Sequence, residues 1–158
     1  MRQLRRSSRA ICRGYGIGTW KRQKFAAEQG GWTLEKYLYI AIGGSLGSIA
    51  RYWVGSTVSG RLGTRFPYGT FVINITACVI IGFALTYLGK RAELNPAWRF
   101  LIPVGFVGAY STFSTYEWET LSTLRSGAFL LALLYAVGSL LLGLLAVWGG
   151  SVLAEVLG

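Results

Sequence analysis

The chain has 158 residues, enough for one domain, and 53% of them are hydrophobic while only 14% are charged. It contains no histidine, which excludes zinc sites built on histidine and the usual Ser-His and Cys-His catalytic pairs. The 22 glycines, set among Leu, Ile and Val, favour closely packed membrane helices over a soluble core. The two cysteines, Cys12 and Cys78, lie in a basic and an apolar stretch, so no disulfide framework is expected.

The net charge of +10 is concentrated near the start of the chain. Residues 1–32 carry eight basic side chains and one acidic side chain, and the rest of the chain is nearly neutral. They contain no nucleic-acid recognition motif, so we expect no nucleic-acid partner and instead favour contact with anionic lipid headgroups. We interpret residues 1–32 as a disordered basic extension of a hydrophobic membrane domain at 33–158. A transit-like sequence or a misassigned start would give the same pattern.

Residues 34–58 form the first predicted membrane span. Small residues such as Gly43 and Gly47 recur at helical spacing, which lets a neighbouring backbone approach closely. Arg51 lies about 10 Å inside the end of this helix at 1.5 Å per residue. A cation at that depth is costly unless it is paired or hydrated. Two interpretations stay open: Arg51 snorkels to the interface, or it is a structural or vestibule cation that attracts anions.

Residues 69–89 form a second predicted span that contains no charge. Thr70 and Asn74 are four residues apart and share one helix face. A buried asparagine in such a span needs hydrogen-bond partners, and simple attachment of one helix to another is one explanation.

The third predicted span, 97–122, contains the most polar stretch of the apolar region, Gly105-Phe-Val-Gly-Ala-Tyr-Ser-Thr-Phe-Ser-Thr-Tyr-Glu-Trp-Glu119. Pro103 and the glycines that follow it predict a local break in this helix. Irregular backbone at membrane depth persists only where protein buries it or a hydrated cavity meets it. Carbonyls released at the break are natural ligands for a small cation. Phe113 and Tyr116 are three residues apart, so their rings can project from one face.

The fourth predicted span, 128–156, is the most apolar. Tyr135, Ser139 and Gly143 lie on one face, which by itself indicates a packing seam.

The charges that flank the four spans are almost balanced between the two sides of the membrane. One side has Lys36, Lys90, Arg91 and Arg99, and the other has Arg61, Arg65 and Arg125. A chain with so little bias can insert in both directions, which allows an antiparallel homodimer. If the basic extension is retained, it favours a cytoplasmic N-terminus instead. Four helices are few to enclose a pore, so a dimer is the more economical architecture.

Three stretches of the chain resemble signatures of the Fluc (CrcB) family of small fluoride channels. They are Gly44-Ser-Leu-Gly-Ser-Ile-Ala-Arg-Tyr52, Pro67-Tyr-Gly-Thr-Phe-Val-Ile-Asn74, and Gly105 through Thr120. The resemblance implies an all-α membrane protein with four transmembrane helices per subunit, a broken third helix and an antiparallel, dual-topology homodimer. It also implies two fluoride pores and a central structural sodium ion, held by the backbone carbonyls of Gly108 and Ser111.

The resemblance assigns roles to further residues. Asn74 matches the pore asparagine, Phe113 the first of two pore phenylalanines, and Arg51 the signature arginine. Polar positions after the break fall on Ser114, Thr115 and Glu119, and part of a hydroxyl track on the fourth helix falls on Tyr135 and Ser139. The chain departs from the family pattern at four positions: Ala109 for glycine, Ser111 for threonine, Tyr116 for the second phenylalanine, and Gly143 where some members carry a hydroxyl.

The function that follows is passive, selective export of fluoride through the bacterial plasma membrane, which protects the cell from fluoride toxicity. A small, strongly hydrated anion needs closely spaced neutral donors, and amide N–H groups, hydroxyls and aromatic edges supply them. We count Thr70 among these donors. An ionised Glu119 would repel the ion, so we expect it to be protonated, hydrogen-bonded or at a pore mouth.

Two other functions fit a small membrane protein of this kind. A dual-topology multidrug exporter needs a carboxylate deep in the first span, whereas Glu35 lies only at its start. A non-conducting assembly subunit would use the same polar residues to hold helices together. An enzyme is not expected, because the sequence shows no nucleophile–base pair or metal cluster.

Overall fold

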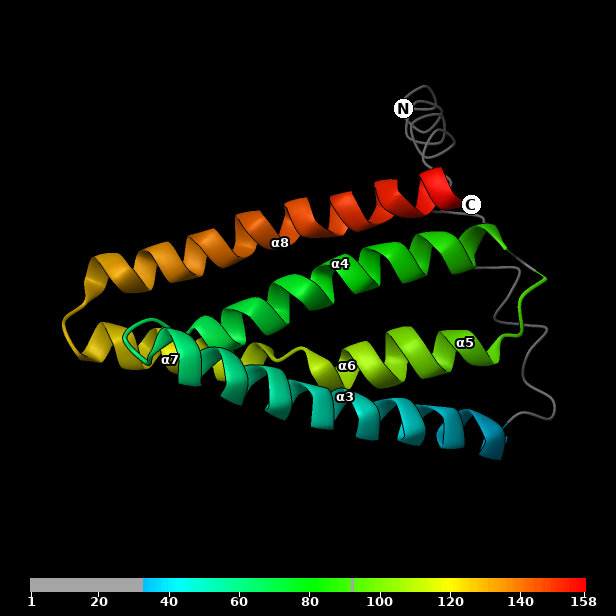
Figure 1. The fold of residues 1–158 in the computed structure, drawn as a ribbon, viewed down its shortest axis with the longest axis horizontal. Coiled ribbons are helices and arrows are strands. Elements are labelled where there is room, and N and C mark those ends of the chain that lie inside the picture. The colour runs from blue at the N-terminus through cyan, green and yellow to red at the C-terminus, as the bar shows by residue number, and fades with distance from the viewer. Residues whose placement is uncertain (1–32, 92) are drawn as a thin grey trace, which may run out of the picture. The chain divides into compact units, whose positions relative to one another are not determined.

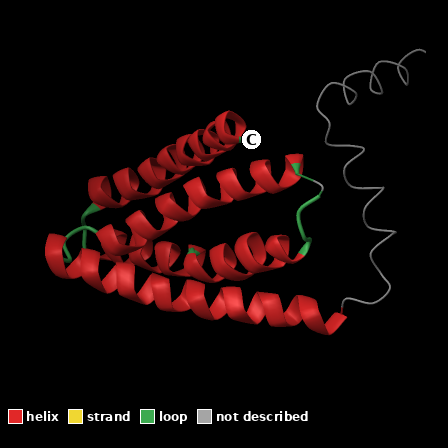
Figure 2. Ribbon diagram, turned by 45° about the vertical axis from the view of Figure 1, so that its right-hand side comes forward, coloured by secondary structure: helices red, strands yellow, loops and turns green. Residues whose placement is uncertain are grey.

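The computed structural model describes residues 33–91 and 93–158, and the predictions made for residues 1–32 lie outside the described residues. Almost all of the described chain belongs to one compact unit, Lys36–Gly158. All elements in the described part are helices, which agrees with the all-α prediction (Figure 2). The elements in chain order are α3 (Thr33–Leu62), α4 (Tyr68–Lys90), α5 (Ala97–Arg99), the π-helix η1 (Phe100–Val107), α6 (Gly108–Tyr110), α7 (Phe113–Arg125) and α8 (Phe129–Leu157).

Helices α3 and α7 end close to a glycine that adopts a left-handed backbone. Gly63 has φ of 82° directly after α3, and Gly127 has the same φ after α7. This conformation is typical of helix C-termini. The first span was predicted to end at residue 58, but α3 continues to Leu62. The two apolar helices, α4 and α8, match their predicted spans to within a residue or two at each end.

The third segment is broken, but not where the sequence placed the break. Pro103 lies inside the π-helix η1. The wider π-helical turn accommodates a proline, which has no backbone N–H to donate, without ending the helix. The chain leaves the helical conformation later, at Ser111 and Thr112, where the backbone is extended with ψ of 158° and 113°. The prediction of a break around Pro103 to Gly108 was therefore wrong in position by a few residues.

Helix α4 packs along α8 on one side and against the broken third segment on the other (Figures 1 and 2). Glycines allow the backbones to touch. A Cβ atom on Gly82 would collide with the Val147 carbonyl of α8, and one on Gly150 would collide with the Val79 carbonyl of α4. In the same way, Gly43 of α3 lies directly against the backbone of η1.

A small apolar core joins α4 to the third segment, next to the break. It consists of Ile73, Ala77, Val107 and Tyr110, each at most 6% exposed. The Tyr110 hydroxyl is not left unpaired, because it lies 2.9 Å from the Thr76 hydroxyl. The core therefore fixes the residue that immediately precedes the irregular backbone.

Two of the described helices, α4 and α8, are long and apolar enough to cross a membrane. Large apolar side chains cover the outer surface of α8, including Leu133, Leu140 and Leu144, which suits contact with lipid better than contact with water. Helix α3 carries more polar residues and the third segment is interrupted. The total of four spans stays a prediction.

The close approach of α4 and α8 gives a stability prediction with a neighbouring control. Gly150→Ala should lower the free energy of unfolding by about 1–3 kcal/mol, because its methyl group overpacks the Val79 backbone. Gly149→Ala should not destabilise the protein, because no atom lies within 4 Å of a Cβ there. Thermal unfolding in detergent measures both variants, and equal melting temperatures would contradict the packing described.

Candidate functional site

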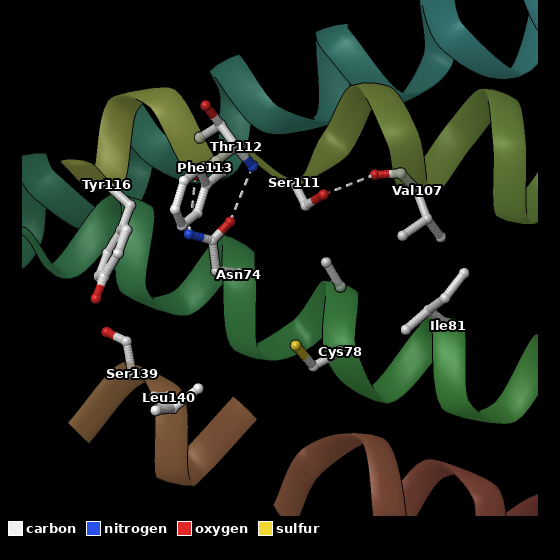
Figure 3. A pocket seen from close by; sticks show the side chains of 11 residues that line it. Asn74, Cys78, Ile81, Val107, Ser111, Thr112, Phe113, Tyr116, Ser139 and Leu140 are labelled. Carbon is white, nitrogen blue, oxygen red and sulfur yellow. Dashed lines mark hydrogen bonds between the residues drawn. The ribbon is translucent and has the colours of Figure 1, made fainter. Parts of the chain in front are cut away.

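The break in the third segment is held by the side chain of Asn74 on α4 (Figure 3). Its Oδ1 accepts a hydrogen bond from the Thr112 backbone N–H at 2.9 Å, and its Nδ2 donates to the Thr112 carbonyl at 3.1 Å. A buried peptide group outside regular structure needs such partners. We expected a buried Asn74 to need hydrogen-bond partners, and these partners are backbone atoms of Thr112 at the break.

Thr112 starts the helix after the break. Its side-chain oxygen accepts from the Thr115 N–H at 3.3 Å, which is N-capping of α7, and its hydroxyl donates to the Thr115 hydroxyl at 3.0 Å. Thr112 is buried. The sequence analysis assigned it no role, although a threonine directly before a helical segment is a recognisable start signal.

Arg51 on α3 reaches the other side of the break. Its guanidinium donates from Nη2 to the carbonyl of Ala109, in the last turn of α6. Carbonyls in the last turn of a helix have no helical donor, so this contact caps α6. This contact agrees with the structural role that the sequence left open for Arg51 and not with snorkelling to an interface, because at least one of its donors is used inside the protein. A role in attracting anions stays a prediction.

A cavity of about 410 Å³ lies beside the break, between the third segment, α4 and α8. Five predicted site residues line it together, Asn74, Ser111, Phe113, Tyr116 and Ser139 (Figure 3). Thr112 also lines it, as does Cys78, which the sequence analysis did not assign to the site. None of the described side chains that line it is charged. The cavity therefore offers neutral donors and aromatic rings to whatever enters it.

The aromatic residues of this region form a continuous ladder. Phe113 and Tyr116 have ring centroids 5.8 Å apart, Tyr116 and Tyr135 5.1 Å, and Tyr135 and Phe66 5.3 Å. The Tyr135 and Phe66 rings meet edge to face, and the other pairs are tilted. The Tyr116 hydroxyl donates to the Ala136 carbonyl on α8 at 3.1 Å. The ladder leads from the break toward the loop between α3 and α4.

Glu119 lies near the far end of this ladder and is hydrogen-bonded. Thr70 donates to its Oε1 at 2.8 Å and Tyr135 donates to its Oε2 at 2.9 Å. Glu119 also lines an outer cavity of about 250 Å³ together with Arg65 and several hydroxyl side chains. The hydrogen bonding that we expected for this residue is thus present, and its place at a pore mouth stays a prediction.

The remaining predicted residues lie elsewhere. Arg51, Thr70 and Thr115 line a separate cavity of about 530 Å³ between α3, α4 and α7. Ser114 is exposed and lines none of the cavities described above. Phe113 is 73% exposed in the single chain even though part of it lines the cavity beside the break.

The chain was compared with known protein families and proteins. Residues 38–151 match the family described as CrcB-like protein, Camphor Resistance (CrcB). The chain belongs to this family. It is similar to the fluoride-specific ion channel FluC of Acidobacterium capsulatum, with 58% identity over 76% of this chain and 96% of the relative. FluC proteins of Solibacter usitatus and Flavobacterium psychrophilum are 49% and 40% identical over 76% and 77% of the chain, covering 98% of each relative.

The likeness to CrcB proteins covers the helices that build the site, but some contacts depend on atoms that no sequence motif reveals. Two acceptors, the carbonyls of Ala109 and Ala136, belong to alanines whose side chains take no part. Only the folded arrangement brings Arg51 and Tyr116 to them. The relatives are named as ion channels, which agrees with the expectation that this CrcB protein is not an enzyme.

Proposed function

We propose that the chain is a fluoride-selective channel that lets fluoride leave the cytoplasm passively. The observation that carries the proposal is the uncharged cavity beside the break, which combines the Asn74 amide, the Ser139 hydroxyl and the rings of Phe113 and Tyr116. The relatives named fluoride-specific ion channel support the same ion for a family member.

The chemistry of the cavity suits an anion that must be bound weakly and often. Fixed cations would hold fluoride too tightly, whereas several neutral sites permit entry and exit. One N–H of the Asn74 amide donates to the Thr112 carbonyl, and its second N–H remains available as a donor. The Ser139 Oγ is buried and has no hydrogen-bond partner among the described residues. The ring edges of Phe113 and Tyr116 carry positive potential and complete the set.

Glu119 belongs to the far end of the path in this proposal. Its carboxylate accepts hydrogen bonds from the hydroxyls of Thr70 and Tyr135, so these two donors are not available to fluoride. The two hydroxyls offset the negative charge, and the outer cavity around Arg65 supplies a neighbouring cation. Glu119 therefore marks the mouth of the path, where the ion regains water.

The channel is proposed to be a homodimer in the cell membrane. Phe113 has a predicted pore role, yet 73% of it is exposed in one chain, so one wall of the path is open. A second copy would close it. The near balance of flanking charges fits two copies inserted in opposite directions. Labelling the two ends of the chain from each side of intact membranes tests this: label on one side only would reject the antiparallel arrangement.

A structural sodium ion is proposed at the break, because the carbonyls of Gly108 and Ser111 lose their usual donors there. In an unbroken helix the N–H of Thr112 would donate to the Gly108 carbonyl, and the N–H of Thr115 to the Ser111 carbonyl. Instead, the first donates to Asn74 and the second to the Thr112 side chain. Free carbonyl oxygens suit a small cation that exchanges water for backbone oxygens. Two carbonyls are few for a complete shell, and a second copy would double them.

The fluoride proposal predicts ion-selective flux. Purified protein in liposomes loaded with fluoride should release it when a potassium ionophore dissipates the membrane potential, and should release no chloride under the same conditions. A fluoride electrode and a chloride electrode follow the two ions. Absent release, or equally fast release of chloride, would reject the function.

The proposed path predicts which substitutions stop conduction without unfolding the protein. Asn74→Asp places a carboxylate against the Thr112 carbonyl and in the cavity, and Phe113→Ile removes a ring edge. Both should abolish fluoride release while the dimer remains assembled, as measured by size-exclusion chromatography with light scattering. If flux persists in both variants, the path lies elsewhere.

The sodium proposal predicts cation-dependent stability. Replacing sodium by N-methylglucamine should lower the melting temperature, by the equivalent of about 2.7 kcal/mol if sodium was present at about one hundred times its Kd. Ser111→Ala should keep this dependence, because only the backbone carbonyl is proposed to bind. A melting temperature that does not change with sodium would contradict the site. Loss of the sodium dependence in Ser111→Ala would contradict it as well.

A further inference from the structure

Tyr116 stands where the resemblance expects a second phenylalanine, and it differs from phenylalanine by one hydroxyl. That hydroxyl already has an acceptor, the Ala136 carbonyl on α8 at 3.1 Å. A phenol has a single proton, so a hydroxyl that donates it to a carbonyl presents only lone pairs to its surroundings. Lone pairs repel an anion. The Tyr116 hydroxyl is therefore not available to bind fluoride in this arrangement.

The same hydrogen bond fixes the ring. Helix α7 contains no fully buried residue along its described length, so side-chain hydrogen bonds matter for its position. The bond from Tyr116 to Ala136 ties it to α8 beside the break, as the bond from Tyr135 to Glu119 does one turn further on, and the Tyr116 ring lies between Phe113 and Tyr135 in the aromatic ladder. Figure 3 shows the hydroxyl end of Tyr116 directed toward the part of α8 that carries Ser139, away from Asn74.

Ser139 complements this arrangement. It lies three residues after Ala136 on α8 and lines the cavity with Tyr116. Its Oγ is buried and has no partner in the part of the chain that the structure describes. A serine hydroxyl rotates freely, so its proton can turn toward an ion in the cavity. One hydroxyl is thus committed to the protein, and its neighbour is available.

We propose that Tyr116 is a positioning residue: its hydroxyl is pinned to α8, so that its ring edge faces the ion while Ser139 supplies the hydroxyl proton. The proposal rests on the proposed function, because it names the ion as fluoride. It deepens that function by separating two hydroxyls that the sequence alone treats as equivalent donors.

Flux measurements in liposomes separate the two roles. Tyr116→Phe keeps the ring and removes the pin, so its half-saturating fluoride concentration should stay the same. Its maximal rate should fall about fivefold, the effect of one neutral hydrogen bond on a conformational equilibrium. Ser139→Ala removes a ligand and should raise the half-saturating concentration several-fold. Tyr87→Phe is the matched control, because Tyr87 stacks on Phe83 and lines none of the cavities described above.

Three kinetic outcomes overturn the proposal. If Tyr116→Phe raises the half-saturating concentration as Ser139→Ala does, its hydroxyl is a ligand. If Tyr116→Phe changes neither parameter, the pin has no role. If Ser139→Ala leaves the half-saturating concentration unchanged, the proton does not come from Ser139.

A spectroscopic measurement tests the pin without relying on transport. In protein labelled with ¹³C at tyrosine Cζ, the signal absent from Tyr116→Phe identifies Tyr116. In mixed H₂O and D₂O this signal should split, because a hydroxyl bonded inside the protein exchanges its proton slowly. The splitting should persist when fluoride is added; a single exchanging line, with or without fluoride, would overturn the pin. Since this result does not need flux, it stays informative if wild-type protein conducts no fluoride.

Discussion

The double hydrogen bond between Asn74 and Thr112 is the interaction on which the rest of the structure depends. A helix interrupted among apolar neighbours leaves peptide groups without their helical partners, at a cost of about 1–3 kcal/mol for each buried group that stays unsatisfied. One amide side chain satisfies both the N–H and the C=O of Thr112. Thr112 then caps α7, which sets the direction in which Phe113 and Tyr116 leave the backbone. The polar path and the break are consequences of the same contact.

The break is also held from its other side, which gives the arrangement its rigidity. Arg51 on α3 donates to the Ala109 carbonyl, and Asn74 on α4 donates to the Thr112 carbonyl. Two different helices are therefore hydrogen-bonded to the third segment on either side of the break. The carbonyls of Gly108 and Ser111 are the ones whose usual donors are diverted. The residues that hold the break therefore also decide which carbonyls lose their helical donors, and the proposed sodium site uses these two.

The sequence predicted the elements best where one physical signal dominated. The charge-free run of α4 and the apolar run of α8 gave bounds close to those observed. The end of α3 was missed because Ser59 and Gly60 are typical of loops, yet the helix continues until Gly63 adopts a positive φ. The break was displaced because a proline suggests interruption, whereas here the helix widens around Pro103 and continues.

The candidate site was predictable in composition but not in connections. Residue types and spacing drew attention to Asn74, Phe113 and Tyr116, the family resemblance added Ser139, and the structure places all four at one cavity. Their partners are mostly backbone atoms, and a backbone carbonyl looks the same at every position of a sequence. The pairing of Tyr116 with Ala136 and of Arg51 with Ala109 therefore had no sequence signal.

The donors that remain after these pairings limit how one chain can bind a small anion. The hydroxyls of Thr70 and Tyr135 donate to the Glu119 carboxylate. The Tyr116 hydroxyl donates to a backbone carbonyl. Within the described cavity this leaves the Ser139 hydroxyl and one N–H of Asn74, with ring edges beside them. Two strong donors cannot replace the hydration shell of fluoride. Phe113 is exposed on one side of this cavity, and the second copy proposed at that face would supply further donors, so the dimer proposal has a chemical as well as a geometric reason.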